Sequence, residues 1–189
     1  VNYLADARKN FTTSEWIDVL LSAMEYDPDG FASSTQKIEF LTRLLIFIEP
    51  RLNVIELAPK GTGKSYVFGN LSKYGWLVSG GKVTRAKLFW DKQKQQAGII
   101  KNHDFTAFDE IQTIIFQEPA EIQAALKSYL ESGKTTIDNQ EFSSECGLML
   151  MGNIPINNGL PVSPLYFDNL PQNFRESALL DRFHCFIEG

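Results

Sequence analysis

The spacing of apolar residues along this chain of 189 residues changes near position 50. Before that point, apolar residues recur at intervals of three and four, which predicts amphipathic helices. The first predicted helix follows Thr12 and Glu15, a pair with capping-box spacing, and its apolar face is formed by Trp16, Val19, Leu20 and Ala23. A second helix, capped by Ser33 and Gln36, is expected to run to Pro50, with apolar residues Ile38, Leu41, Leu44, Leu45 and Ile48.

After residue 50, short apolar runs alternate with helical segments. The predicted strands cover 54–57, 76–79, 104–109, 147–152 and 183–187, and the predicted helices cover 66–73, 118–132 and 175–180. Residues 134–143 have a hairpin pattern, whereas 82–101 are ambiguous, with strand-like pieces around Val83 to Trp90. This alternation predicts an α/β domain with a mainly parallel sheet, whose ligand lies at the carboxyl ends of the strands. We expect a helical segment at 1–50 and the α/β core at 51–189.

A glycine-rich segment joins the first predicted strand to the helix after it. It reads Ala58-Pro59-Lys60-Gly61-Thr62-Gly63-Lys64-Ser65. Strand, glycine loop and helix form the context of a phosphate-binding loop (P-loop), in which backbone N–H groups and the helix N-terminus attract an anion. Ala58 replaces the usual first glycine, but the Gly-x-Gly-Lys-Ser turn is intact. The alternative is a loop that matches the pattern by accident.

The P-loop pattern assigns a role to each of its later residues. Lys64 is expected to reach the β- and γ-phosphates of ATP, and the Ser65 hydroxyl to bind Mg²⁺. The loop residues before them are expected to surround the phosphates; they are Lys60, Gly61, Thr62 and Gly63. The predicted cofactors are therefore ATP and Mg²⁺.

Two later predicted strands also end in polar residues. Residues 104–108 lead into Asp109 and Glu110, and residues 147–152 lead into Asn153. In a nucleotide hydrolase, one such carboxylate holds Mg²⁺ and the next deprotonates the attacking water; Asp109 fits the first role and Glu110 the second. The Asn153 amide can bond the γ-phosphate or that water. The alternatives are a solvated strand end and a loop cap before Pro155, but all these strand ends are expected at one sheet edge.

Composition narrows the classes of protein that remain. With 43% hydrophobic and 22% charged residues, the chain has the make-up of a soluble globular protein of one domain. No apolar stretch approaches the roughly 18 residues that span a bilayer, so no membrane partner is expected. Cys146 and Cys185 lie outside any metal-binding spacing, which predicts buried thiols and a cytoplasmic location. Because the chain begins at Val1 rather than Met, we expect it to be part of a larger protein.

The net charge of −5 is unevenly distributed. Between Lys82 and Lys101 there are six basic residues and one acid, Asp91, so this segment carries +5 and the rest of the chain −10. A basic patch on an acidic body can contact nucleic-acid phosphates, and Phe89 and Trp90 within it can stack on bases. The alternative is a lysine-rich loop exposed to solvent.

Four motifs in order resemble the core of an AAA+ ATPase. They are the P-loop, Ala107-Phe108-Asp109-Glu110-Ile111, the Met151-Gly152-Asn153-Ile154-Pro155 stretch and Leu179-Leu180-Asp181-Arg182-Phe183. The closer resemblance, over residues 40–189, is to the Lon-like ATPases of bacterial BREX phage-defence systems, which are similar to the MCM replicative helicases. This resemblance implies an ATPase ring, expected to be a hexamer, with further domains on both sides of this chain and a helical lid beyond it. No Ser–Lys protease dyad can be assigned here.

The resemblance also implies roles for three segments. Arg182 would be the finger that reaches the γ-phosphate bound by a neighbouring subunit, with Arg175 as a second candidate. The alternative for Arg182 is a structural ion pair with Asp181 or Glu188. Residues 80–101 would form an insert, and 134–143 a hairpin, that both face the pore of the ring. DNA is then the expected partner through 82–101 and 134–143.

Three function classes follow from these motifs. The first is a ring ATPase that acts on DNA in phage defence, which the basic segment 82–101 favours. The second is a protein-unfolding motor of a Lon-type protease, in which Phe89 or Trp90 would grip polypeptide. The third is a nucleotide-binding module without hydrolysis, which the combination of Lys64, Ser65, Asp109, Glu110 and Arg182 disfavours.

Overall fold

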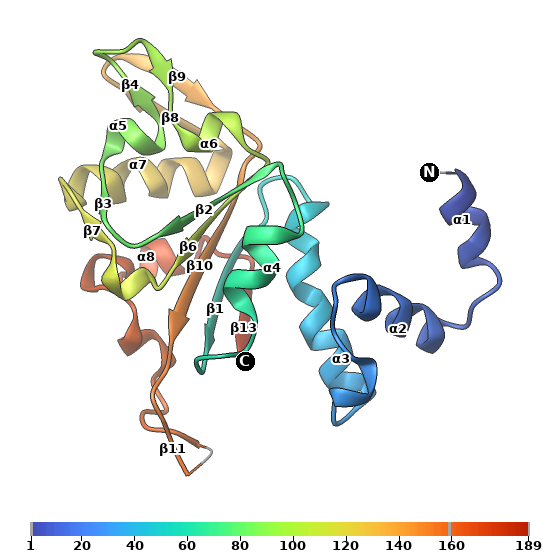
Figure 1. Ribbon diagram of the computed structural model, residues 1–189. Coiled ribbons are helices and arrows are strands. Elements are labelled where there is room, and N and C mark those ends of the chain that lie inside the picture. Colours follow the sequence, from blue (N-terminus) through green and yellow to red (C-terminus); the bar gives the residue numbers. More distant parts are fainter. Residues whose placement is uncertain (1, 159, 189) are drawn as a thin grey trace. The chain divides into compact units, whose positions relative to one another are not determined.

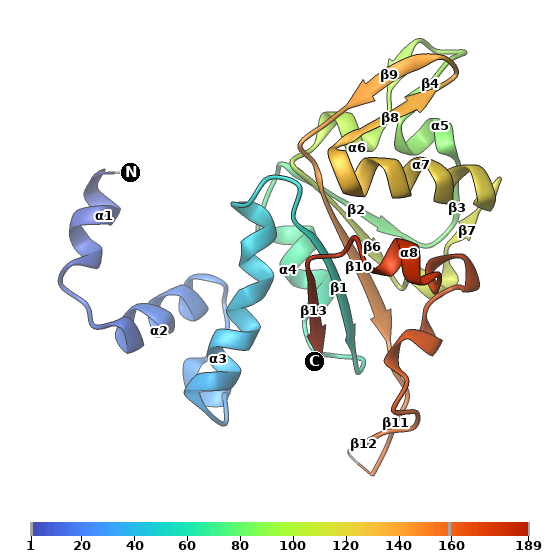
Figure 2. The same cartoon turned by 180° about the vertical axis from the view of Figure 1, so that it is seen from behind.

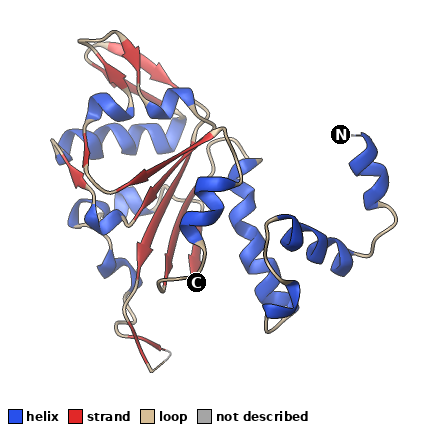
Figure 3. Cartoon of the chain, viewed as in Figure 1, coloured by secondary structure: helices blue, strands red, loops and turns tan. Residues whose placement is uncertain are grey.

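The computed structural model describes residues 2–158 and 160–188 (Figure 1). Two compact units divide the chain, Val1–Leu45 and Ile46–Gly189. Among the described residues, the strands all belong to the second unit (Figure 3).

The first unit is helical, as its apolar spacing predicts. It contains α1 (Asn2–Arg8), α2 (Thr13–Ala23) and α3 (Ser34–Leu41). The capping box of α2 is present: Thr12 N donates to Glu15 Oε2 over 2.8 Å and Glu15 N donates to Thr12 Oγ1 over 3.3 Å. At the start of α3, Gln36 N donates to Ser33 Oγ over 3.2 Å.

The predicted helix from Ser33 to Pro50 is shorter than expected. The α-helix ends at Leu41, and a 3₁₀-helix, Thr42–Phe47, follows it. Apolar residues three apart share a face in both helix types, so their spacing did not reveal the change. The buried side chain of α2 is Leu21, which lies outside the predicted apolar face.

The second unit is built on a parallel sheet of five strands in the order β13-β1-β10-β6-β2. The strands are β1 (Asn53–Ala58), β2 (Gly75–Ser79), β6 (Phe105–Asp109), β10 (Gly147–Asn153) and β13 (Cys185–Glu188). The predicted α/β fold of the P-loop class is confirmed. The burial of every residue from 53 to 58 reflects a central strand covered on both faces.

Helices cover both faces of this sheet (Figures 1 and 2). On one face, α4 (Lys64–Asn70) contacts β2, and Phe68 of α4 packs against Phe105 with the ring centroids 6.2 Å apart. On the other face, α7 (Pro119–Ser132) contributes Ile122, Leu126 and Tyr129 to the main apolar cluster. The prediction for α7 is confirmed at both ends, whereas α4 begins and ends earlier than the predicted 66–73 because the P-loop itself turns into the helix.

Tyr129 ties α7 to the start of β10. Its hydroxyl donates to Cys146 O over 2.6 Å in the buried core. Burial raises the pKa of the Tyr129 phenol and raises that of the Cys146 thiol to about 12. Both groups are therefore neutral at physiological pH, and Cys146 is a buried core residue, as its apolar surroundings predict.

Residues 82–102 form a small mixed insert between β2 and β6. It contains β3 (Lys82–Val83), α5 (Arg85–Leu88), β4 (Trp90–Asp91), β5 (Gln96–Ala97) and α6 (Ile99–Asn102). The expected strand-like piece from Val83 to Trp90 is thus partly helical, because Thr84 caps α5 by accepting from Lys87 N over 3.0 Å.

The expectation that Phe89 contacts DNA or polypeptide is wrong. Phe89 is fully buried and makes edge contacts with Phe142 and Tyr129, with centroid distances of 5.3 and 6.0 Å. Trp90 is half-buried and packs against the same cluster. Phe89 and Trp90 therefore attach the insert to the core and do not project into solvent.

A hairpin follows α7, as predicted. Gly133 ends the helix with a φ of +73°, and β8 (Lys134–Ile137) pairs with β9 (Gln140–Ser143). The short strands not yet described are β7 (Ile115–Phe116), which pairs with β3, β11 (Ile156–Asn157) and β12 (Leu160–Pro161), and the last α-helix is α8 (Ser177–Leu180). The predicted helix 175–180 is thus shorter than expected: α8 begins at Ser177, and a 3₁₀ turn, Gln172–Phe174, precedes the predicted range.

Candidate nucleotide-binding site

The P-loop lies between the end of β1 and the start of α4. Gly61 and Gly63 have φ values of +84° and +78°, in the left-handed region that favours glycine. A Cβ on Gly61 would meet no atom within 4 Å, so this glycine is required by the backbone conformation rather than by crowding. The turn brings the chain directly into the N-terminus of α4 at Lys64.

The Lys64 side chain folds back under this loop. It is 5% exposed, and its Nζ donates to Pro59 O over 2.8 Å and to Ala58 O and Thr62 Oγ1 over 3.2 Å. A buried ammonium needs such acceptors. A phosphate entering the loop offers charged oxygens in place of neutral ones, and charge-assisted hydrogen bonds are about twice as strong.

Two acids stand at the end of β6. Asp109 Oδ1 accepts from Glu110 N over 3.0 Å. Glu110 has a φ of +47°, which is uncommon for a residue with a side chain and often marks a functional site. Thr113 Oγ1 donates to Glu110 O over 2.9 Å and stabilises this turn.

Asn153 meets these acids from the next strand. It ends β10, in register with Ala58 at the end of β1, and its Nδ2 donates to Glu110 Oε1 over 3.3 Å. Gln112, a residue that sequence patterns did not indicate, donates through Nε2 to Asn153 O over 3.2 Å. Gln112 reaches β10 because the chain turns at Glu110, and the spacing of residues along the sequence does not reveal such a turn.

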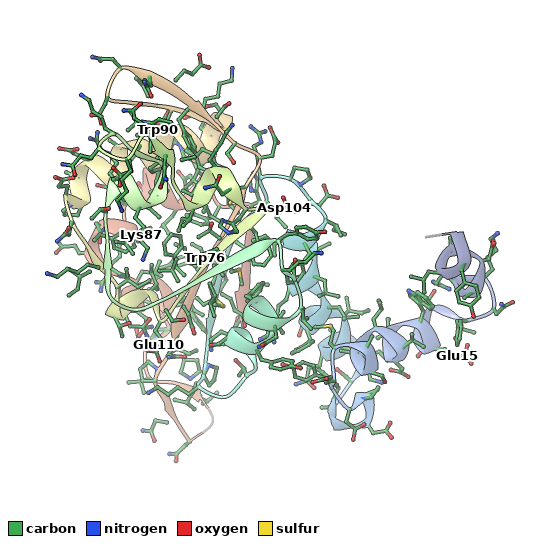
Figure 4. The ribbon with its side chains drawn as sticks, turned by 45° about the horizontal axis from the view of Figure 1, so that its top comes forward. Glu15, Trp76, Lys87, Trp90, Asp104 and Glu110 are labelled. Carbon is green, nitrogen blue, oxygen red and sulfur yellow. The ribbon has the colours of Figure 1, made fainter. Side chains whose placement is uncertain are left out.

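One open pocket of about 390 Å³ is lined by the predicted site residues other than Arg182 and Arg175, together with Tyr66. Its lining is Lys60, Gly61, Thr62, Gly63, Lys64, Ser65, Tyr66, Asp109, Glu110 and Asn153. The lining combines a buried cation, a helix N-terminus and two carboxylates, a set suited to a phosphate with a divalent cation. In Figure 4, Glu110 lies towards the lower end of the core and Trp90 of the insert towards its upper end.

Two side chains of this pocket could bind Mg²⁺ together with the phosphates of a nucleotide. The Ser65 hydroxyl and the Asp109 carboxylate are oxygen donors, which Mg²⁺ prefers. Within residues 2–158 and 160–188 there is no group of three or more His, Cys, Asp or Glu side chains that could hold a metal alone. Mg²⁺ commonly takes one or two protein carboxylates together with substrate phosphates.

Arg182 lies away from this pocket. His184 N donates to Asn53 O over 2.8 Å, so this part of the chain is beside the first residue of β1. The P-loop follows the last residue of β1, five steps of about 3.3 Å or roughly 16 Å further along the strand. Arg182 Nη2 pairs with Glu131 Oε2 at 2.8 Å, and Nη1 donates to Ala178 O.

The alternative partners expected for Arg182, Asp181 and Glu188, are not those it contacts. Its ion pair is with Glu131 near the end of α7, a partner 51 residues away that sequence proximity could not suggest. Its Nε is buried and is the one such side-chain atom without a hydrogen-bond partner among the described residues. Arg175, the second candidate, donates through Nε to Leu170 O over 2.7 Å.

Comparison with known proteins agrees with this geometry. The model of a protein family described as "Lon-like protease BrxL-like, ATPase domain" matches residues 1–189. The chain belongs to this family. It is 36% identical over 186 residues to a Lon-like protease BrxL of Escherichia coli O9:H4 (strain HS), and 34% identical over 187 residues to a Lon-like protease BrxL of Bacillus cereus (strain H3081.97). The family resemblance inferred from the motifs is confirmed.

These alignments cover 97% of this chain but only 26% and 27% of the two relatives. The chain therefore spans about a quarter of the length of the BrxL relatives that it matches. Among its described residues, no helix has both the length and the apolar character needed to cross a membrane.

Proposed function

We propose that this chain binds and hydrolyses ATP as part of an oligomeric ring, expected to be a hexamer, that acts on DNA in BREX-type phage defence. The observation that carries the proposal is the single pocket that unites the P-loop with Asp109, Glu110 and Asn153. Membership of an ATPase-domain family supports the same chemistry.

Within this pocket, the P-loop residues bind the phosphates. The backbone from Lys60 to Gly63 surrounds them, and Lys64 exchanges its carbonyl partners for phosphate oxygens. Ser65 and Asp109 would hold Mg²⁺, which neutralises charge on the phosphates when bound.

Glu110 acts as the general base for the attacking water. Its carboxylate lies in the pocket and accepts from Asn153 Nδ2. Asn153 thereby orients Glu110 and offers its amide to the water or the γ-phosphate. Proton transfer to a positioned base of this kind typically contributes about 10²–10⁴ in rate.

Arg182 acts on a neighbouring subunit. Arg182 lies two residues before His184, which contacts Asn53 at the amino end of β1, whereas the P-loop of the same chain follows the carboxyl end of β1. A finger that neutralises transition-state charge must lie against the γ-phosphate. The site to which Arg182 contributes is therefore that of the next chain in the ring.

DNA is the proposed substrate of the ring because the insert carries exposed cations. Lys82, Lys87, Lys92 and Lys94 are exposed. The hairpin contributes polar groups rather than charge, since Lys134 pairs with Glu141 at 3.4 Å. The polypeptide-unfolding alternative loses the support of Phe89, which is buried.

ATP binding is tested by calorimetry of the intact protein with ATP and Mg²⁺. Lys64→Ala removes the buried cation and is expected to abolish detectable binding. Lys73→Ala, which removes an exposed lysine outside the pocket lining, is the matched control and should bind like the wild type. Unchanged affinity in a folded Lys64→Ala protein would refute the assignment of this pocket.

A further inference from the structure

Arg85 is held between two carboxylates from separate elements. Its Nη2 contacts Asp138 Oδ1 at 3.0 Å, and its Nη1 contacts Glu121 Oε2 at 3.4 Å. Arg85 belongs to α5 of the insert, Glu121 to the first turn of α7, and Asp138 to the hairpin that follows α7. The Arg85 side chain is 26% exposed. This cation, counted above among the six basic residues of the insert, already has its partners.

Asp138 occupies the turn of the hairpin. Ile137 pairs with Gln140, so the turn consists of Asp138 and Asn139, which have φ values of +49° and +66°. This two-residue turn with both residues left-handed favours Asn, Asp and Gly. The residue that makes the turn therefore also supplies the carboxylate that meets Arg85.

The two ion pairs lie at the wall of an open hollow. A cavity of about 530 Å³ lies between α5, α7 and β8, and Arg85, Glu121 and Asp138 are in its lining. Nearer the core, apolar packing also joins the insert to the hairpin, because Phe89, which follows α5, contacts Phe142 of β9. The hairpin is thus attached to the insert at its base by this apolar packing and by Lys101 Nζ, which donates to Ser143 O over 2.5 Å, and at its tip by the Arg85–Asp138 ion pair.

Arginine suits the ionic attachment because its planar fork offers several donors in fixed directions, so one side chain can meet two acceptors. A lysine at this position would present one ammonium on a flexible stem. Figures 1 and 2 show α5, β4, β8 and β9 gathered at the same end of the second unit.

We propose that Arg85 is a positioning residue that fixes the tip of the 134–143 hairpin to the 82–102 insert, so that both present one DNA-contacting surface. It does not itself neutralise a phosphate; the exposed lysines Lys87 and Lys92 do. The DNA-contacting part of this inference rests on the proposed function, whereas the attachment between the two segments does not.

Hydrogen exchange of the intact protein tests the attachment alone. Arg85→Ala is expected to speed amide exchange in residues 134–143 severalfold, and Arg85→Lys to have a smaller effect. Asp138→Asn should reproduce Arg85→Ala, since it removes the charge at the other side of the contact. Lys87→Ala, two residues away on α5, is the control and should leave hairpin exchange unchanged. Wild-type exchange in Arg85→Ala would overturn the proposal.

The salt dependence of DNA binding tests whether Arg85 positions the DNA-contacting surface or contacts a phosphate itself. Losing a phosphate contact lowers the slope of log K against log salt by about 0.9. Arg85→Ala should weaken binding at least about threefold with the slope unchanged, whereas Lys87→Ala with Lys92→Ala should lower the slope by about 1–2. A lowered slope in Arg85→Ala would overturn the positioning role. If the lysine variants bind normally, the DNA proposal fails, and hydrogen exchange still decides the attachment.

Discussion

At the scale of single residues, Glu110→Gln isolates the proposed base. Glutamine keeps the size of the side chain and can still face Asn153, but it cannot accept the proton of water. We expect ATP to bind with wild-type affinity and turnover to fall about 10²–10⁴-fold. Calorimetry and a phosphate-release assay on the intact protein measure the two quantities. Wild-type hydrolysis would remove Glu110 from the mechanism.

The residues of the pocket can be predicted from the sequence, whereas their contact partners cannot. Lys64, Asp109, Glu110 and Asn153 each follow an apolar strand, and parallel strands have their carboxyl ends on the same side of a sheet. The structure places all four in one pocket, and their catalytic roles stay predictions. The prediction for Phe89 is wrong because a sequence shows an aromatic residue beside lysines but not which side chain turns inward.

At the scale of elements, segments with clear end signals were predicted better than segments without them. The five strands and α7 follow from apolar runs with clear end signals, such as Glu118-Pro119 and Gly133 at α7. By contrast, the apolar spacing does not separate the 3₁₀-helix Thr42–Phe47 from the α-helix before it, and α5 has only four residues, too few to show a helical period. Tertiary contacts decide their form instead.

Gly133 ends α7, and its replacement tests how the helix passes into the hairpin. Its φ is +73°, and an added Cβ would lie 3.2 Å from Ser144 O and closer still to the Arg51 side chain. Gly133→Ala is expected to lower the free energy of unfolding by about 1–2 kcal/mol. Gly30→Ala, with no atom within 4 Å of the added Cβ, should stay within about 0.5 kcal/mol of the wild type. Denaturant titration compares them, and equal stabilities would contradict this view of the turn.

At the scale of the whole molecule, the residues proposed for hydrolysis do not all lie in one pocket. The pocket combines the P-loop with Asp109, Glu110 and Asn153. Arg182 is not in its lining and lies two residues before His184, which contacts Asn53 at the amino end of β1. The sequence could place Arg182 only by family resemblance, because its distance from the P-loop depends on how β13 pairs with β1. The central claim is therefore that hydrolysis needs two neighbouring chains.

Mixing two inactive variants of the intact protein tests this claim most directly. Arg182→Ala rings lack the finger and Lys64→Ala rings lack the phosphate site, so neither should hydrolyse ATP. In a random equal mixture, about a quarter of the interfaces pair an intact Lys64 site with an intact Arg182. The account predicts that ATPase activity returns towards that fraction of the wild-type rate once the subunits exchange, as followed by fluorescent labels. No recovered activity despite demonstrated exchange, or wild-type activity in homogeneous Arg182→Ala rings, would contradict it.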